Sequence, residues 1–243
     1  MEPLINVKEA AVFLHVAEMT IRRWTNSGLL SCYRVGGNRE RRFRMQDLQD
    51  FLHQRSGLAT SPQGLAALGT RGIMIPDGLH FSHLSASEQE SREVGISYIQ
   101  QGLSQQESVL LVTSEAKVAR YTHLLERQGI NVKEATSRQL LQIHTGEETP
   151  EAMVAVIGRQ IAVANGPFRL FGDMTWTQGK GWQLENLRQL EELGRSLPET
   201  PGHLFLCQYP LACFSGQELM MAVETHSYTL YKNALQKSPY FIH

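Results

Sequence analysis

The sequence predicts an α/β protein with two domains: a small module of helices and a β-hairpin over residues 1–54, and a larger parallel α/β domain over residues 78–243. Three observations support this division. The chain has 243 residues, more than one small module needs, and 42% of them are hydrophobic, so substantial cores can form. Helical periodicity dominates the first fifty or so residues, whereas strand and helix patterns alternate after residue 79. Residues 55–77, between them, are rich in Gly, Ser, Thr and Pro, which is typical of a linker.

Two short amphipathic helices are predicted at the start of the chain. In the first, apolar residues recur at i, i+3, i+4 and i+7 after Asn6, whose side chain can cap the first turn. The second ends before Gly28, which suits a left-handed C-terminal cap. Because about three residues separate them, the pair fits a helix-turn-helix, whose second helix can enter a DNA major groove. The apolar positions are Val7, Ala10, Ala11 and Leu14 in the first helix and Met19, Ile21 and Trp24 in the second.

A β-hairpin is predicted next, around the turn Gly36-Gly37. Residues 33–44 hold five arginines and one acid. Residues 1–55 contain nine Lys/Arg and six Asp/Glu, a net +3, whereas the rest of the chain carries −4. Such local positive charge indicates a polyanion as partner, the alternative being a solvated arginine-rich turn. A third helix, with Met45, Leu48, Phe51 and Leu52, is expected to close the small core.

Over residues 6–53 these segments resemble the excisionase and MerR type of winged helix-turn-helix, in Val7-Lys8-Glu9-Ala10-Ala11, Thr20-Ile21-Arg22-Arg23-Trp24, Ser27-Gly28, Tyr33-Arg34-Val35-Gly36-Gly37 and Arg41-Arg42-Phe43-Arg44. The resemblance implies that the second helix reads DNA while the hairpin, or wing, grips the backbone. The implied DNA-binding residues are Thr20, Arg22 and Arg23 in the helix and Arg34, Arg39, Arg41 and Arg42 in the wing. One module makes few contacts, so two copies on a two-fold operator are expected. Since the long dimerising helix of MerR proteins is absent, we expect a homodimer formed through the C-terminal domain.

The larger domain is predicted to alternate strands with helices. Strands are expected at 79–81, 109–112, 168–172 and 204–207, where short apolar runs suit a sheet buried on both faces. A helix should begin near Ser85 or Ser87, each followed three residues later by Glu, and carry Leu103. Further helices are expected over 115–128, 150–164, 182–196 and 216–226. This order predicts a parallel α/β sandwich whose binding groups lie beyond the carboxyl ends of the strands.

Residues 78–241 resemble the MEDS domain, a sensory module of methanogen and methylotroph proteins and of the dichloromethane-responsive repressor. The resemblance rests on His80, Val109–Val112, Gly172-Asp173-Met174-Thr175-Trp176, Cys207-Gln208-Tyr209, Thr225-His226 and Pro239-Tyr240-Phe241. It implies a RecA- or KaiC-like fold that has lost its phosphate-binding loop, and indeed no G-x-x-x-x-G-K-[ST] motif occurs. It also implies a C1 or halogenated C1 effector. The implied ligand-binding residues are His80, Asp173, Trp176, Cys207 and His226.

The residues themselves leave the roles of these side chains open. Asp173 could bind a ligand or pair with a charge, or it could be a helix cap or a solvated loop acid. Trp176 could stack on a ligand or simply pack. Cys207 could be a small buried hydrophobe, or could join His80 and His226 in a metal or thiol-sensing site. His203 and Cys207 lie roughly 13 Å apart on one strand and cannot share an ion, so distant segments would have to assemble any such site. No metal is therefore assigned. Glu191-Glu192 and Gln105-Gln106-Glu107 are interpreted as exposed helix faces.

Together these features predict a one-component DNA-binding transcriptional regulator that senses a small molecule. No cofactor is expected, and no nucleophile motif with its base supports an enzyme using Asp173, Cys207 and His226. An excisionase-like architectural protein with a protein-binding domain, or a Cys/His metal or redox sensor, remains the alternative. Three cysteines without a C-x-x-C pair indicate free thiols, and the absence of a secretory signal or an apolar run long enough to span a membrane predicts a cytoplasmic protein.

Overall fold

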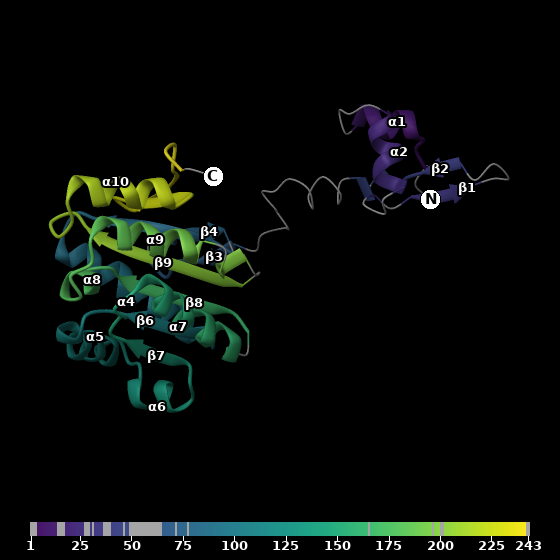
Figure 1. Cartoon of the computed structure of the whole chain (residues 1–243). Coiled ribbons are helices and arrows are strands. Elements are labelled where there is room, and N and C mark those ends of the chain that lie inside the picture. Colours follow the sequence, from purple (N-terminus) through teal and green to yellow (C-terminus); the bar gives the residue numbers. More distant parts are fainter. Residues whose placement is uncertain are drawn as a thin grey trace. The chain divides into compact units, whose positions relative to one another are not determined.

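A computed structural model describes residues 4–13, 18–26, 30, 32–35, 40–45, 47–48, 65–70, 72–76, 78–164, 166–195, 197–199 and 202–241. The chain forms two compact units, residues 1–63 and residues 64–243. Figure 1 shows the elements of each unit.

The smaller unit contains α1 (Val7–Phe13), α2 (Glu18–Asn26) and a hairpin of β1 (Tyr33–Val35) and β2 (Glu40–Arg42). Asn6 caps α1 as predicted, since its Oδ1 accepts from the Glu9 amide at 3.0 Å while Glu9 Oε2 accepts from the Asn6 amide at 2.7 Å. The backbone at Met45, Asp47 and Leu48 is helical, but the rest of the expected third helix, Leu14 and the side chain of Trp24 lie outside the described residues. The core consists of Val7, Ala10, Ala11, Ile21, Leu30, Phe43 and Leu48.

The larger unit is built on a seven-stranded sheet in the order β11-β10-β5-β9-β8-β6-β7, with neighbours parallel except β10 and β11. The expected parallel α/β sandwich is therefore present. The strands are β5 (His80–Ser85), β6 (Ser108–Val112), β7 (Leu141–His144), β8 (Phe168–Asp173), β9 (His203–Pro210), β10 (Tyr228–Tyr231) and β11 (Ala234–Lys237). The helices are α4 (Glu88–Ser104), α5 (Glu115–Arg127), α6 (Val132–Ser137), α7 (Pro150–Val163), α8 (Trp176–Gly179), α9 (Leu184–Gly194), the 3-10 turn Leu197–Glu199 and α10 (Gly216–Thr225).

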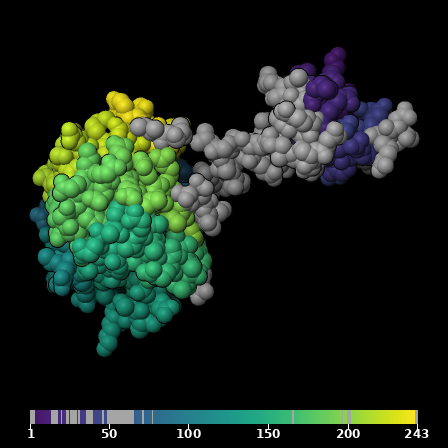
Figure 2. Space-filling model, in the orientation of Figure 1, coloured from purple at the N-terminus to yellow at the C-terminus, as the bar shows by residue number. Residues whose placement is uncertain are grey.

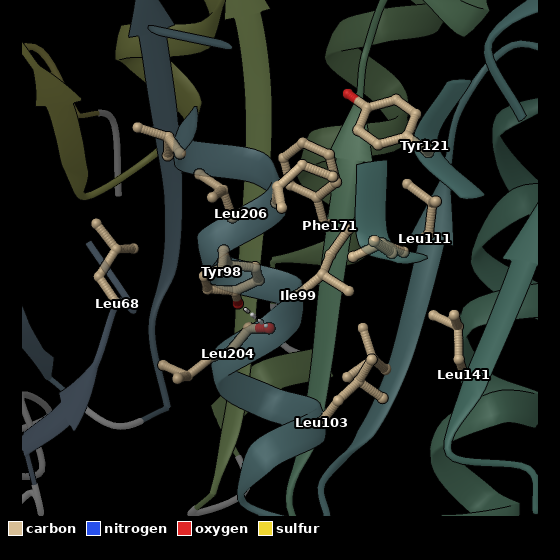
Figure 3. Packing of buried hydrophobic residues seen from close by; sticks show 14 of the residues in the cluster. Leu68, Tyr98, Ile99, Leu103, Leu111, Tyr121, Leu141, Phe171, Leu204 and Leu206 are labelled. Atoms are coloured by element: carbon tan, nitrogen blue, oxygen red, sulfur yellow. Dashed lines mark hydrogen bonds between the residues drawn. The ribbon is translucent and has the colours of Figure 1, made fainter. Parts of the chain in front are cut away.

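Helices cover both faces of this sheet, which is why its strands are almost continuously apolar. On one face α4 packs against the central strands, and Tyr98 donates a hydrogen bond to the Leu204 carbonyl at 2.8 Å in the middle of this core (Figure 3). On the other face α7, α9 and α10 form the second layer, with α9 and α10 side by side (Figures 1 and 2). Of the two serines considered for the start of α4, Ser87 is the cap, since its hydroxyl accepts from the Glu90 amide.

The expected linker over residues 55–77 is structured in its second half. β3 (Leu65–Ala67) and β4 (Met74–Pro76) pair antiparallel, and Leu68 and Ile75 are fully buried in the core beside α4. Gly69 has φ +97°, and a Cβ there would lie 2.2 Å from the Ser97 carbonyl oxygen, so the hairpin approaches α4 closely. The larger unit thus begins near residue 64, because these apolar side chains add to its core.

A buried ion pair connects β8 to the start of the larger unit. Arg169 is completely buried and donates to the Glu107 carboxylate, whose side chain is 11% exposed. Its Nη1 also donates to the Ala67 carbonyl of β3 at 3.0 Å, and its guanidinium lies 5.0 Å from the centre of the Tyr98 ring. The interpretation of Glu107 as an exposed helix residue is wrong, because it follows α4 and neutralises a charge inside the protein.

Candidate functional site

The second helix of the smaller unit carries three of the residues assigned to DNA. Thr20, Arg22 and Arg23 belong to α2, and the side chains of Thr20 and Arg23 lie outside the described residues. Arg22 is exposed and forms an ion pair of 3.7 Å with Glu18 one turn earlier. Exposed pairs of this kind contribute about 1 kcal/mol or less, so Arg22 could exchange this partner for a phosphate or a base at little cost.

The hairpin carries three more of these arginines. In its register Arg34 faces Arg41 across the strands, and Tyr33 faces Arg42. Arg42 also pairs with Glu40 at 2.7 Å, while the expected contact residue Arg39 lies outside the described residues. The cross-strand arrangement concentrates positive charge on a narrow ribbon, which is the distribution that phosphate binding requires.

Three of the five expected ligand-binding residues meet inside the larger unit. His80 begins β5, Cys207 lies within β9, and His226 directly follows α10. Glu191 of α9 joins them from the helix layer, and we call these four residues the His-Glu-Cys cluster. Their donor atoms all lie within 4.8 Å of one another, and every member is buried. The sheet and two neighbouring helices thus assemble a polar site from segments far apart in sequence.

The distances inside the cluster are short and similar. His80 Nε2 lies 3.1 Å from His226 Nε2, 3.2 Å from Glu191 Oε2 and 3.3 Å from Cys207 Sγ. Glu191 Oε2 is 3.4 Å from His226 Nε2 and 3.7 Å from Cys207 Sγ. The four side-chain atoms therefore lie around one common point, next to α9.

Two outer hydrogen bonds orient the cluster. His226 Nδ1 lies 2.7 Å from the Ala222 carbonyl, which can only accept, so Nδ1 carries a proton and the neutral ring has a free lone pair on Nε2. The Tyr209 hydroxyl donates to Glu191 Oε1, which leaves Oε2 facing the cluster. Both bonds aim lone pairs at the cluster centre.

Burial and neighbouring charges set the protonation states. Burial lowers the pKa of His226 to about 4, although the Glu191 carboxylate opposes this shift, so the ring is neutral at pH 7. Burial by itself raises the pKa of Glu191, but the imidazoles of His226 and His80 and the Tyr209 hydroxyl outweigh it and hold this pKa at about 2. Burial and the Glu191 carboxylate raise the pKa of the Cys207 thiol well above its usual value. At neutral pH the site thus offers a carboxylate, a neutral imidazole and a thiol.

A cavity of about 30 Å³ adjoins the cluster. His80, Glu191 and Cys207 form its polar wall, while Trp176 and other apolar side chains of the helix layer and sheet form the rest. Trp176 is 2% exposed and packs edge-on against Trp182, with ring centres 4.8 Å apart. Trp176 therefore packs in the core and also forms part of the cavity wall.

Asp173, the remaining expected ligand residue, lies elsewhere, at the carboxyl end of β8. Its carboxylate accepts from Lys117 Nζ at 2.9 Å, the Tyr121 hydroxyl at 3.1 Å and the Thr175 hydroxyl at 2.7 Å. Its ion pair with Lys117 agrees with the charge-pairing role, and its burial excludes the solvated loop acid. Asp173, Lys117 and Tyr121 border a pocket of about 350 Å³, which is also lined by Arg120 and by the ends of β5 and β9.

Glu191 is the member of the His-Glu-Cys cluster that the sequence does not predict. It was assigned to an exposed face, but its exposure is 1%. The spacing of Leu187, Leu190 and Gly194 does contain a signal, because these buried residues and Glu191 follow the i, i+3, i+4, i+7 pattern of one helix face. An acid inside such a stripe needs a partner, and only the fold shows that the partners are histidines.

A helix-turn-helix module joined to a parallel α/β unit with a buried polar site defines the class of DNA-binding regulators with a sensory domain. Among the described residues, no helix is long and apolar enough to cross a membrane. The sequence model of the family described as "MEDS: MEthanogen/methylotroph, DcmR Sensory domain" matches residues 79–227, and that of a helix-turn-helix domain matches residues 4–56. The chain therefore belongs to the MEDS family, and it combines the sensory domain with a DNA-binding one.

Two similar proteins place this assignment in context. The transcriptional repressor DcmR of Methylorubrum extorquens (strain DSM 6343 / CIP 106787 / DM4) is 27% identical over 252 residues, which cover 97% of this chain and 94% of the repressor. The crystal structure of a KaiC-like protein from Pyrococcus horikoshii OT3 matches with a TM-score of 0.56 and 13% identity, over 74% of this chain and 90% of that protein. The second likeness concerns the fold alone, and it agrees with the expected RecA- and KaiC-like sheet.

Proposed function

We propose that this protein is a transcriptional repressor that releases DNA when its MEDS domain binds a small molecule. The observation that carries the proposal is the match of both domains, in the same order, to a repressor along nearly the whole chain. A ligand that binds one arrangement of the protein more tightly than another shifts the population between them, and DNA affinity follows by linkage.

DNA is read by α2 and gripped by the wing. Arg22 and Arg23 are the candidates for base contacts, because a guanidinium can bond guanine in bidentate fashion. Arg34, Arg39, Arg41 and Arg42 bind phosphates from the hairpin. Two copies act on a two-fold site, and the larger units supply the dimer contacts. Light scattering of the purified chain should therefore give twice the mass of 27.4 kDa, and a monomer at micromolar concentration would contradict this part of the proposal.

The effector is a molecule of a few heavy atoms that binds beside Trp176 and Cys207. The size of the cavity supports this choice, because one water needs about 10–15 Å³ and roughly 30 Å³ admits little more than a C1 compound. Its mostly apolar wall favours a weakly polar guest, such as a halogenated methane, over an ion. The larger pocket beside Asp173 would suit a bigger, polar effector, and the experiment below separates the two.

The DNA-binding part is tested by the salt dependence of binding to duplex DNA. Each phosphate contact contributes about 0.9 to the slope of log K against log salt. The double variant Arg41→Ala, Arg42→Ala removes two contacts from each chain and four from the dimer, so it should lower the slope by about 4. The control exchanges Arg127 and Arg159, both exposed in the larger unit, for Ala and should leave the slope unchanged. An unaltered slope in the wing variant would contradict the wing assignment.

The effector part is tested with dichloromethane as probe. We expect it to raise the melting temperature of the chain and to weaken DNA binding. Gly172→Ala adds a methyl group to the cavity wall and should abolish the response while leaving DNA affinity without probe unchanged. Gly158→Ala, whose new Cβ meets no atom within 4 Å, is the matched control. If the response survives Gly172→Ala but is lost in Lys117→Ala, the effector binds in the pocket beside Asp173 instead. No response of the wild-type chain to dichloromethane would favour the alternative in which the larger domain binds another protein.

A further inference from the structure

We propose that the His-Glu-Cys cluster is a tetrahedral site for one divalent ion of the zinc type. The ligands would be Nε2 of His80, Nε2 of His226, Sγ of Cys207 and Oε2 of Glu191. This inference concerns the cluster alone and does not depend on the effector or on DNA binding.

The separations between the donor atoms fit a tetrahedron. Zinc binds nitrogen, oxygen and sulfur at about 2.0–2.3 Å, which requires neighbouring ligand atoms to lie roughly 3.3–3.7 Å apart. Five of the six separations are 3.1–3.7 Å, and the sixth, between Cys207 Sγ and His226 Nε2, is at most 4.8 Å. Binding would require shifts of a few tenths of an ångström for most pairs, without any backbone rearrangement.

The ligand atoms are oriented by the protein around them. The Ala222 carbonyl holds the proton of His226 on Nδ1, so the lone pair of Nε2 faces the other three ligands. The Tyr209 hydroxyl occupies Glu191 Oε1 and leaves Oε2 for the ion. Metal sites rely on such outer hydrogen bonds to fix the tautomer of a histidine and the direction of a carboxylate.

Charge balance favours a divalent cation. Glu191 contributes one negative charge, and Cys207 contributes a second when it loses its proton to bind a metal. Among the described residues the ion-pair contacts of Glu191 are with His80 and His226, and neither a lysine nor an arginine supplies a permanent positive charge to this buried carboxylate. A 2+ ion would neutralise both ligand charges inside a site whose four members are all buried.

The competing explanation is a metal-free set of hydrogen bonds, in which His80 Nε2 and the Cys207 thiol donate to His226 and Glu191. In that case His80 Nδ1 carries only a lone pair, and this atom is buried without a hydrogen-bond partner. In the metal-bound form the proton sits on Nδ1 and Nε2 is free to bind, so Nδ1 is a buried atom without a partner in both explanations and does not separate them. The two explanations differ in whether the cluster retains an ion, which is directly measurable.

The experiment measures metal content and the spectrum of cobalt in the full chain. We expect one zinc ion per chain after purification without chelator. Titration of chelator-treated protein with Co²⁺ should saturate at one equivalent and give the visible bands of a tetrahedral ion with a thiolate-to-cobalt charge-transfer band. Substoichiometric zinc in the purified chain, together with no such spectrum, would overturn the proposal.

Matched variants assign the ligands. Cys207→Ser should remove the charge-transfer band, whereas Cys213→Ser, at an exposed cysteine, should keep it. Glu191→Gln should weaken cobalt binding at least tenfold, and His123→Gln, at an exposed histidine, should not change it. If Cys207→Ser does not fold, the wild-type spectrum still shows whether a cysteine binds the ion, because the charge-transfer band requires a thiolate ligand. Retention of that band in Cys213→Ser then assigns it to Cys207 or to Cys32. Cys32→Ser then separates these two, and loss of the band in that variant would overturn the site.

The outcome is separable from that of the proposed function. A metal-free chain that still binds DNA and responds to dichloromethane would contradict the metal site alone. A zinc-loaded chain that does not bind DNA would support the metal site and contradict the proposed repressor function.

Discussion

Replacing Glu107 with glutamine should be among the most damaging single changes in the larger unit. The substitution keeps the shape of the side chain but removes the negative charge that faces Arg169. Arg169 is fully buried, so no water can replace the lost partner. Its remaining contacts are the Ala67 carbonyl, the Gln105 side-chain oxygen and the face of the Tyr98 ring, and none of them carries a full charge.

The expected loss can be estimated from this burial. Breaking a buried ion pair on one side costs about 3–5 kcal/mol. The amide oxygen of glutamine can still accept a hydrogen bond, so we expect a value of about 3 kcal/mol, at the lower end of that range. A domain of this size loses roughly 2–4 °C of melting temperature per kcal/mol, which gives a decrease of about 6–12 °C.

Urea denaturation of the full chain, followed by tryptophan fluorescence, measures this loss; Trp176 and Trp182 report on the larger unit and Trp24 on the smaller one. The matched control is Glu134→Gln, which removes an ion pair of 3.7 Å with Arg138 in which both side chains are more than half exposed. The control should cost about 1 kcal/mol or less. If Glu107→Gln costs no more than the control, Arg169 does not depend on this carboxylate and the reasoning is refuted.

Three further outcomes are expected. Gly146→Ala should cost about 2–4 kcal/mol in urea denaturation, because its φ is +85° and its Cβ would lie 2.1 Å from the Trp176 ring, whereas Gly181→Ala, with positive φ but open space, should show only the backbone part. Burial lowers the pKa of His83, so at mildly acidic pH the folded chain keeps this ring neutral while the unfolded chain protonates it. The free energy of unfolding should therefore fall as the pH decreases below about 6.5, and His83→Gln should reduce this fall between pH 7 and 5. Tyr98→Phe should cost about 0.5–1.5 kcal/mol, since it removes one buried hydrogen bond between α4 and β9, and equal melting curves would contradict this.

The sheet could be predicted where strands are buried on both faces. Val109–Val112, Phe168–Gly172 and Leu204–Cys207 are runs of mostly apolar residues, and they form β6, β8 and β9. Strands nearer the edges gave weaker signals. β7 and β11 mix apolar with polar residues because each has a neighbouring strand on one side only, and their pattern does not differ from that of a loop.

The candidate site was partly predictable for a different reason. Family resemblance brought together His80, Cys207 and His226, and the fold does place them in contact. Glu191 was missed because its role depends on how α9 lies on the sheet, which a local pattern does not encode. Asp173 was grouped with the same site, yet it ends a strand whose next residues turn towards Lys117, and this separates it from the cluster.

The β3–β4 hairpin determines where the sensory domain can be cut. A fragment starting at residue 78 would match the family boundary, but it would strip Leu68 and Ile75 from the core and leave α4 uncovered. It would also remove the backbone oxygen of Ala67 that solvates the guanidinium of Arg169. Truncations made for ligand screening should therefore start at about residue 64, and poor solubility of a shorter version would reflect the missing hairpin rather than an unstable domain.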